Sequence, residues 1–291
     1  MNAARTMIVH GDCQAEAVAA VLGRDPVVSE RFRVIYSRSY DHPVEGRGNL
    51  PPADVSSCAV LCEQHDPIGF RQQALLPANC FTVKFPALDL NLLWPFNCVN
   101  PYNVPEPPLF PFGRFPYGDR VIVAKIDEGM PPAEIVKFYL ERWDDYKLDL
   151  ERLRSLEYAR INARDTRCDI KMAGQVAERF ALRQLFWAVN HPTNPLLEEL
   201  IAQILRACER IDPQLVDADV SSTLATYFGP LGPLGAVSIP VHPKVAEYFE
   251  LEWYDPRATY RNWDGSTFSY TEYFEALVRF SYANKTARLP A

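Results

Sequence analysis

Residues 7–23 read MIVHGDCQAEAVAAVLG, and this stretch decides the fold of the first part of the chain. An apolar run leads into the turn Gly11–Gln14, and an alanine-rich segment with apolar residues at helical spacing follows. The pattern predicts a buried strand over 6–10, a tight turn and a helix over 13–23. It places Cys13 at the junction of strand and helix, which is where parallel α/β proteins bind their ligands.

The next segments continue this pattern. Apolar strands are predicted at three further places, 32–37, 57–63 and 80–86. A short helix is predicted over 65–77, with Asp66 as its cap and Pro67 in its first turn. Strands that alternate with helical pieces indicate a small parallel sheet of SGNH or flavodoxin-like type. We therefore expect residues 1–86 to form an α/β subdomain.

The rest of the chain has a different texture. Residues 87–120 are dense in proline and aromatic side chains, which predicts a long ordered loop. Residues 121–291 are expected to be mainly helical. Helical patterns lie over 131–165, 169–190, 194–211, 242–253 and 269–283. Because no flexible linker separates these parts, we expect the α/β subdomain to be embedded in a mainly helical fold with one shared core.

Composition excludes several classes of protein. The 291 residues are 48% hydrophobic, enough for a large core, and the net charge is -7 without a dense basic run. A nucleic-acid role is therefore not expected. The start, MNAARTMIVH, lacks a secretory signal pattern, and no apolar run is long enough for a membrane helix. The seven cysteines are scattered. They indicate reduced thiols and no metal site in a soluble, cytoplasmic protein.

Cys13 is the first candidate for chemistry. A helix N-terminus presents free N–H groups and favours the thiolate, so we expect Cys13 to be a nucleophile beside an oxyanion hole. Gly11, Asp12 and Gln14 would shape this turn, and Gln64, at the end of the third strand, could donate to an oxyanion. The sequence resembles the Gly-Asp-Ser block of SGNH hydrolases with cysteine for serine, but it lacks their Asp-x-x-His ending. A packing role for Cys13 remains the alternative.

The histidines supply candidate bases. His191 lies in NHPTNP, which we place between two helices, and it could act as a general base or bind the substrate. The alternative is a turn in which it caps a carbonyl. His242 lies in IPVHPKV and is typical of a helix start. His10 ends the first strand, beside the turn, where a structural role is also open.

Five pieces in one order carry a wider resemblance: GDCQAEA, FP with LWPF, CDIKMAGQVAERFALRQLFWAVNHPTNPLLEEL, IPVHPKVAEYFELEW and FSYTEYF. Together they resemble the WcbI family of capsular polysaccharide-biosynthesis proteins over nearly the whole chain. That family usually has asparagine where this chain has Asp12. The resemblance implies coenzyme A (CoA) binding in a deep, loop-lined pocket and O-acetyl transfer from acetyl-CoA to a capsule or exopolysaccharide sugar. It also implies other polysaccharide-biosynthesis enzymes as partners.

A CoA site needs groups that bind phosphate. We expect Arg71, Lys84, Arg183 and His242 to bind this co-substrate, and Cys13 with His191 to catalyse the transfer. Transfer through an acetyl-cysteine and direct transfer both fit the residues. Two other functions stay open: a cysteine-dependent SGNH-like esterase or thioesterase, and a non-catalytic accessory protein that binds CoA or sugar.

Overall fold

A computed structural model describes residues 5–42, 45–65 and 69–287. The chain forms two compact units that interleave along the sequence. Unit 1 comprises Met1–Asp89, Tyr158–Arg179 and Asn190–Gly235, and unit 2 comprises Leu90–Glu157, Phe180–Val189 and Ala236–Ala291. This partition differs from the consecutive division into 1–86, 87–120 and 121–291, because two later segments return to pack with the N-terminal sheet.

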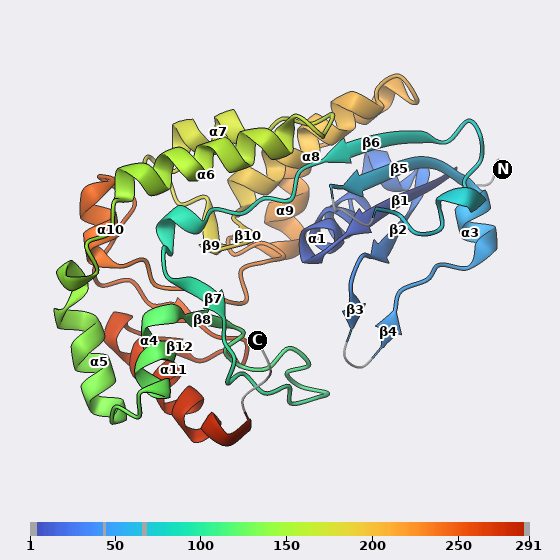
Figure 1. The fold of residues 1–291 in the computed structure, drawn as a ribbon. Coiled ribbons are helices and arrows are strands. Elements are labelled where there is room, and N and C mark those ends of the chain that lie inside the picture. Colours follow the sequence, from blue (N-terminus) through green and yellow to red (C-terminus); the bar gives the residue numbers. More distant parts are fainter. Residues whose placement is uncertain (1–4, 43–44, 66–68, 288–291) are drawn as a thin grey trace. The chain divides into compact units, whose positions relative to one another are not determined.

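Unit 1 is built on a four-stranded parallel sheet. Its strands are β1 (Arg5–Gly11), β2 (Phe32–Arg38), β5 (Cys58–Gln64) and β6 (Phe81–Phe85). The order is β2-β1-β5-β6, and every neighbouring pair is parallel (Figure 1). Met7, Ile8 and Val9 of β1 are fully buried, as the apolar run predicted for a central strand. The predicted α/β subdomain within a mainly helical fold is confirmed.

Helices and short strands complete unit 1. They are α1 (Cys13–Leu22), α2 (Pro26–Ser29), β3 (Asp41–His42), β4 (Gly46–Arg47), α3 (Pro52–Ser56), α6 (Leu150–Asp165, which begins in unit 2), α7 (Ala173–Arg179), β10 (His191–Pro192), α8 (Asn194–Cys208) and α9 (Val220–Phe228). Helix α1 packs on β1 and β2, and α8 packs on β6. The apolar stripe of α8 is buried, with Leu197, Leu200 and Ile201 at 0% exposure.

Unit 2 combines helices with short antiparallel pairs. Its elements are β7 (Asn97–Val99) paired with β8 (Tyr117–Asp119), α4 (Arg120–Asp127), α5 (Pro132–Glu141), β9 (Phe186–Ala188), α10 (Pro243–Tyr248), β11 (Tyr260–Arg261) paired with β12 (Thr267–Phe268), and α11 (Tyr270–Ala283). Helix α11 packs on α4 and α5 around an aromatic core that includes Tyr139, Tyr273 and Phe274. The proline-rich segment 87–120, predicted as a long loop, contains the strands β7 and β8.

Several predicted helices are shorter than expected. The helix over 131–165 is divided into α5, a 3-10 turn at Trp143–Tyr146 and α6, and Lys147 adopts a left-handed backbone (φ 45°) at the break. The helix over 169–190 is wrong beyond α7, because its apolar end forms strand β9. Short apolar runs fit a buried strand as well as a helix, so periodicity alone could not separate them.

The predicted helix over 65–77 is not formed in its described part, 69–77. Its proposed cap, Asp66, and Pro67 lie outside the described residues, and the later part contains a single 3-10 turn, Gln73–Leu75.

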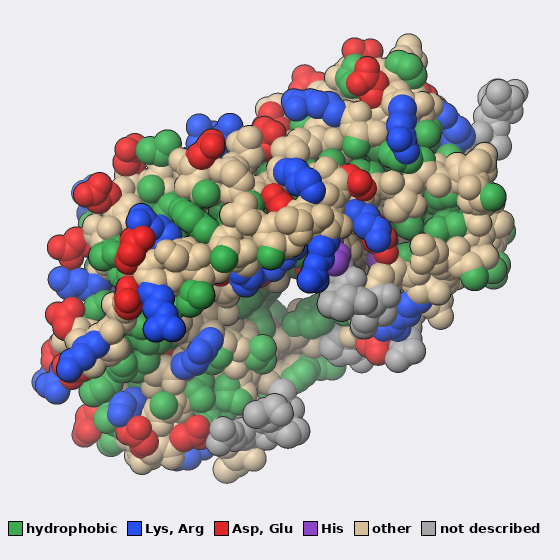
Figure 2. Space-filling model, turned by 45° about the horizontal axis from the view of Figure 1, so that its top comes forward, with side chains coloured by type: hydrophobic (Ala, Val, Ile, Leu, Met, Phe, Trp, Pro, Cys, Tyr) green, Lys and Arg blue, Asp and Glu red, His purple; other side chains and the backbone are tan. Residues whose placement is uncertain are grey.

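Acidic and basic side chains are intermixed over the part of the surface that Figure 2 shows. Within the described ranges, no helix is long and apolar enough to cross a membrane.

Candidate functional site

The carboxyl edge of the unit 1 sheet gathers the candidate residues. Strands β1, β2 and β5 end at Gly11, Arg38 and Gln64, and Gly11 pairs with Arg38 in the β1–β2 ladder. Because the strands are parallel, the segments that follow them meet at one edge. Cys13 is the first residue of α1 and follows β1 by a single residue, Asp12.

Gly11 is required for the close approach of β5 to this turn. Its φ of +155° is rare for other residues, and a Cβ atom here would collide with the Gln64 side chain and lie 2.8 Å from Cβ of Ala15. The Asp12 backbone N–H, in turn, donates to Oε1 of Gln64 (2.8 Å). The end of β5 is thus tied to the start of α1.

Gln14 holds three segments of the chain together. Its Nε2 donates to the backbone oxygens of Leu88 (2.7 Å) and Asn190 (2.8 Å), and its Oε1 accepts the Leu88 N–H (2.8 Å). Gln64 donates to the same Oε1 (3.3 Å). Both amide protons of Gln14 are therefore used within the protein, and its side chain is fully buried. This arrangement indicates a positioning role for the Gln14 side chain.

The acidity of Cys13 differs from the sequence expectation. Burial raises the pKa of its thiol, and the neighbouring carboxylates of Asp12 and Glu16 raise it further. The backbone N–H groups at the start of α1 lower it, as expected of a helix N-terminus, but they are outweighed. Cys13 is therefore a neutral thiol at pH 7 and not an activated thiolate.

Replacing Asp12 by asparagine is expected to make Cys13 more reactive. Asparagine caps helices as well as aspartate does, so α1 should stay intact while one negative charge is removed. Each unit of decrease in the thiol pKa gives about tenfold more thiolate. Mass-spectrometric mapping after brief iodoacetamide treatment at fixed pH should show several-fold faster labelling of Cys13. Asp219→Asn, at the cap of α9, is the control and should change nothing. An unchanged rate in Asp12→Asn would mean that this charge does not govern the thiol.

His191 lies in the same unit as Cys13. It is on β10, after strand β9, and not between two helices as predicted. It is 4% exposed, and burial lowers its pKa to about 4, partly offset by a hydrogen bond with the Leu234 backbone. The residue before it, Asn190, accepts the Gln14 hydrogen bond. The Gln14–Asn190 hydrogen bond therefore connects the residue after Cys13 to the residue before His191.

A small, open polar pocket lies at this sheet edge. His10, Ser37, Arg38 and Arg71 line it, and Nδ1 of His10 lies 3.1 Å from Oγ of Ser37. Arg38 also binds the exposed Glu45 carboxylate at 2.6 Å. Of the predicted phosphate ligands, Arg71 is thus placed in a pocket that already contains a second guanidinium.

The other predicted ligands are placed differently. The ammonium group of Lys84 on β6 lies 3.6 Å from the carboxylate of Glu63. Arg183 and His242 belong to unit 2, whereas Cys13 belongs to unit 1. His242 is the cap of α10, with its Nδ1 accepting the Lys244 N–H at 3.1 Å, so the predicted helix start is observed. In the described part of the chain, no group of three or more His, Cys, Asp or Glu side chains could hold a metal ion.

Sequence reasoning missed Arg38 and Tyr36. The Tyr36 hydroxyl shares its proton between the backbone oxygens of Gly11 and Asp12, both at 3.2 Å, which fixes the turn before α1. Both residues lie at the end of β2, next to β1 in the sheet. The carboxyl ends of neighbouring parallel strands meet at one edge of the sheet. Applied to the predicted sheet, this rule would have added the residues at the end of β2 to the candidate site.

The comparisons with known proteins agree with this architecture. Residues 6–212 match the family model "Polysaccharide biosynthesis enzyme WcbI". A solved structure of WcbI superposes with a TM-score of 0.71 at 16% identity, covering 98% of this chain and 94% of that chain. That structure is described as a novel polysaccharide biosynthesis enzyme, in its native form without a disulfide bond between CoA and one of its cysteines. No curated protein matches the chain.

Proposed function

The chain belongs to the WcbI family of polysaccharide biosynthesis enzymes, and from this premise we propose that it transfers the acetyl group of acetyl-CoA to a sugar hydroxyl. The acceptor would be a precursor of a capsular polysaccharide or exopolysaccharide. The observation that carries the proposal is the carboxyl edge of the unit 1 sheet, where Cys13 starts a helix and a pocket with two arginines opens.

The polar pocket suits the phosphates of CoA. Guanidinium groups bind phosphate with paired, charge-assisted hydrogen bonds, and Arg38 and Arg71 can supply them. Ser37 and Asn49 add neutral hydrogen-bonding groups to the same wall. The solved WcbI structure adds support, because its description names CoA together with one of its cysteines, in a form without a disulfide bond between them. We propose that the thiol end of CoA lies at Cys13.

The energetics favour direct transfer over an acetyl-cysteine. An ordinary thiol has a pKa of about 8.5, so moving its proton to a histidine of pKa about 4 costs about 6 kcal/mol. Burial of Cys13 adds to this cost, because it raises the thiol pKa further. In direct transfer the sugar oxygen attacks the thioester carbonyl, and its proton moves to His191 as the new C–O bond forms. The C–S bond then breaks, and CoA leaves as a thiol with the proton from His191.

The first turn of α1 would stabilise the developing oxyanion. The Gln14 N–H is already used by the capping Asp12 carboxylate at 2.8 Å, so the Cys13 N–H is the donor that we assign to the oxyanion. The neutral Cys13 thiol then contacts the reacting thioester without adding charge. Gln14 and Gln64 act as positioning residues that hold the turn.

CoA is expected to raise the melting temperature of the protein. A ligand at about 100 times its Kd adds about 2.7 kcal/mol to stability. For a chain of this length, each kcal/mol is worth about 2–4 °C, so the shift should be about 5–11 °C. Differential scanning fluorimetry with saturating CoA and acetyl-CoA measures it.

The polar pocket provides the matched variants for this test. Arg71→Ala should abolish most of the shift, whereas Arg257→Ala, a change at a side chain that is 90% exposed, should keep it. If the wild-type melting temperature does not move with either compound, and calorimetry gives no heat, the protein does not use acetyl-CoA and the proposed function is wrong.

A further inference from the structure

Two cysteine thiols lie in contact at the amino edge of the unit 1 sheet, at the other end of the strands from Cys13. Cys58 is the first residue of β5, and Cys80 directly precedes β6. Their sulfur atoms are 3.6 Å apart. The starts of β5 and β6 meet at this edge because the two strands are parallel neighbours.

The backbone geometry suits a disulfide bond between these two residues. Strand β5 pairs with β6 at Val60 and Phe81, so Cys80 is one residue past the position opposite Cys58. Neighbouring strands lie about 4.8 Å apart and rise about 3.3 Å per residue, which gives a Cα–Cα distance of about 6 Å. A disulfide bridges Cα atoms that are about 4.4–6.8 Å apart. The bond can therefore form by rotation of the two side chains, without movement of the strands.

Cys80 is the accessible member of the pair. Its N–H donates to the Pro77 oxygen at 2.9 Å, which closes a turn in which Ala78 and Asn79 are exposed. Cys80 itself is half-buried, whereas Cys58 is 1% exposed. A reagent from solution can therefore reach the sulfur of Cys80 and not that of Cys58.

The two thiols also differ in acidity. A hydrogen bond with the Cys58 side chain lowers the pKa of the Cys80 thiol, against the effect of its partial burial. The same hydrogen bond and burial raise the pKa of Cys58. The first thiolate therefore forms on Cys80, with the protonated Cys58 thiol beside it. A thiolate next to a second thiol is the arrangement from which protein dithiols undergo disulfide exchange.

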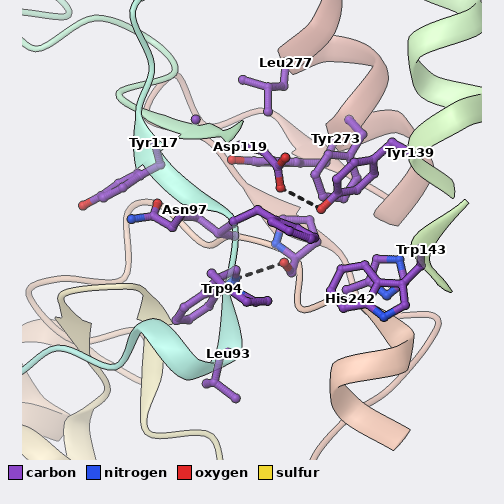
Figure 3. Close-up of a pocket in the computed structure, with 16 residues that line it drawn as sticks. Leu93, Trp94, Asn97, Tyr117, Asp119, Tyr139, Trp143, His242, Tyr273 and Leu277 are labelled. Atoms are coloured by element: carbon purple, nitrogen blue, oxygen red, sulfur yellow. Dashed lines mark hydrogen bonds between the residues drawn. The ribbon is translucent and has the colours of Figure 1, made fainter. Parts of the chain in front are cut away.

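Other cysteines of the chain provide internal comparisons. Cys62 and Cys208 are also hydrogen-bonded to each other, but both are 0% exposed. Cys98 is half-buried and follows Asn97, which Figure 3 shows together with Asp119 in unit 2. Burial and the Asp119 carboxylate raise the pKa of Cys98 to about 11. The first pair therefore has a partner thiol without access, and Cys98 has access without an acidic thiol.

We propose that Cys58 and Cys80 form a reversible disulfide by exchange with a small-molecule disulfide, RSSR. The Cys80 thiolate attacks one sulfur of RSSR, the S–S bond breaks, and RS⁻ leaves. The Cys58 thiol then loses its proton and attacks the Cys80 sulfur of the mixed disulfide, which releases a second RS⁻. The two thiol protons end on the two RS⁻ ions, so the protein dithiol is oxidised and RSSR is reduced to two RSH. The proposal is independent of acetyl transfer.

Incubation of the full chain with excess oxidised glutathione at about pH 8, near the ordinary thiol pKa, tests the proposal. After free thiols are blocked with N-ethylmaleimide, trypsin should release peptide 48–71 cross-linked to peptide 72–84, and fragmentation should place the bond on Cys58. The cross-link should form about tenfold faster than glutathione adds to Cys98, whose pKa of about 11 leaves little thiolate. Dithiothreitol should remove the cross-link.

Two variants separate exchange within the pair from simple exposure of one thiol. Cys58→Ala removes the second thiol, so Cys80 should accumulate as a mixed disulfide with one glutathione, which the wild-type protein does not retain. Cys80→Ser should form neither the mixed disulfide nor the cross-link. Cys98→Ser is the matched control and should form the cross-link at the wild-type rate.

Either of two results would overturn the proposal. One is wild-type protein, shown to be folded by its melting curve, that keeps Cys58 and Cys80 free or retains glutathione on Cys80 as Cys58→Ala does. The other is a bond between Cys62 and Cys208 that forms as fast as the Cys58–Cys80 bond, because oxidation would then not depend on the access that the structure gives to Cys80.

Discussion

Replacing His191 by alanine is expected to slow acetyl transfer about a hundredfold or more, the usual scale for a lost general base. The CoA-induced melting shift should persist, because the arginines that we assign to the phosphates are elsewhere in unit 1. Transfer is measured with labelled acetyl-CoA and polysaccharide oligomers as acceptors, and CoA release without an acceptor is measured beside it. An acceptor-independent release as fast as transfer would indicate a thioesterase instead.

The pH profile separates direct transfer from an acetyl-cysteine. His191 is deprotonated, and so able to accept a proton, above its pKa of about 4. The rate in direct transfer should therefore fall as pH drops through about 4 and stay level from pH 6 to 8. A thiolate nucleophile at Cys13, whose pKa is raised, would instead give a rate that climbs about tenfold per pH unit across that range.

Cys13→Ser supplies the matching variant. With direct transfer it should keep activity within about tenfold of wild type, since the step asks only for a neutral group beside the thioester. A loss as large as that of His191→Ala would assign Cys13 to a covalent step. If His191→Ala is fully active, His10 in the polar pocket becomes the base to test.

Replacing Gln14 by alanine should cause the largest loss of stability of any single change at this site. It removes the buried hydrogen bonds that the Gln14 side chain makes to the N–H and C=O groups of Leu88 and to the C=O of Asn190. Each unsatisfied group costs about 1–3 kcal/mol, so we expect at least about 3 kcal/mol in total. At about 2–4 °C per kcal/mol, the melting temperature should fall by about 6–12 °C or more.

Gln72 offers a matched control for that measurement. Its side chain makes the same pair of bonds to one residue, accepting the Leu50 N–H and donating to the Leu50 oxygen, both at 2.9 Å. Gln72 is only half-buried, so water can replace these bonds. Gln72→Ala should therefore lower the melting temperature by a few degrees at most. Equal losses in the two variants would show that burial of the Gln14 network does not matter.

The local part of this site could be predicted from the sequence. The strand, turn and helix over 6–23 follow from an apolar run, Gly11 and an alanine-rich period, all within one short segment. The other three strands of the sheet are likewise apolar runs, and each was found to within a few residues. Arg71, predicted as a CoA ligand, lines the polar pocket at this edge.

The rest depends on contacts between distant residues. The partners of Gln14 lie 74 and 176 positions away, and no local pattern encodes those distances. The pKa of Cys13 was predicted with the wrong sign, because the helix N-terminus is visible in the sequence and burial is not. The helix over 131–165 was predicted as continuous because its apolar spacing continues through the left-handed Lys147.

A crystal structure of the protein with CoA tests the central claim most directly. We predict that the CoA sulfur contacts Sγ of Cys13, within about 4 Å, and that its phosphates are bound by Arg38 and Arg71. Clear density for CoA at any place where its sulfur is out of contact with Cys13 would contradict the account.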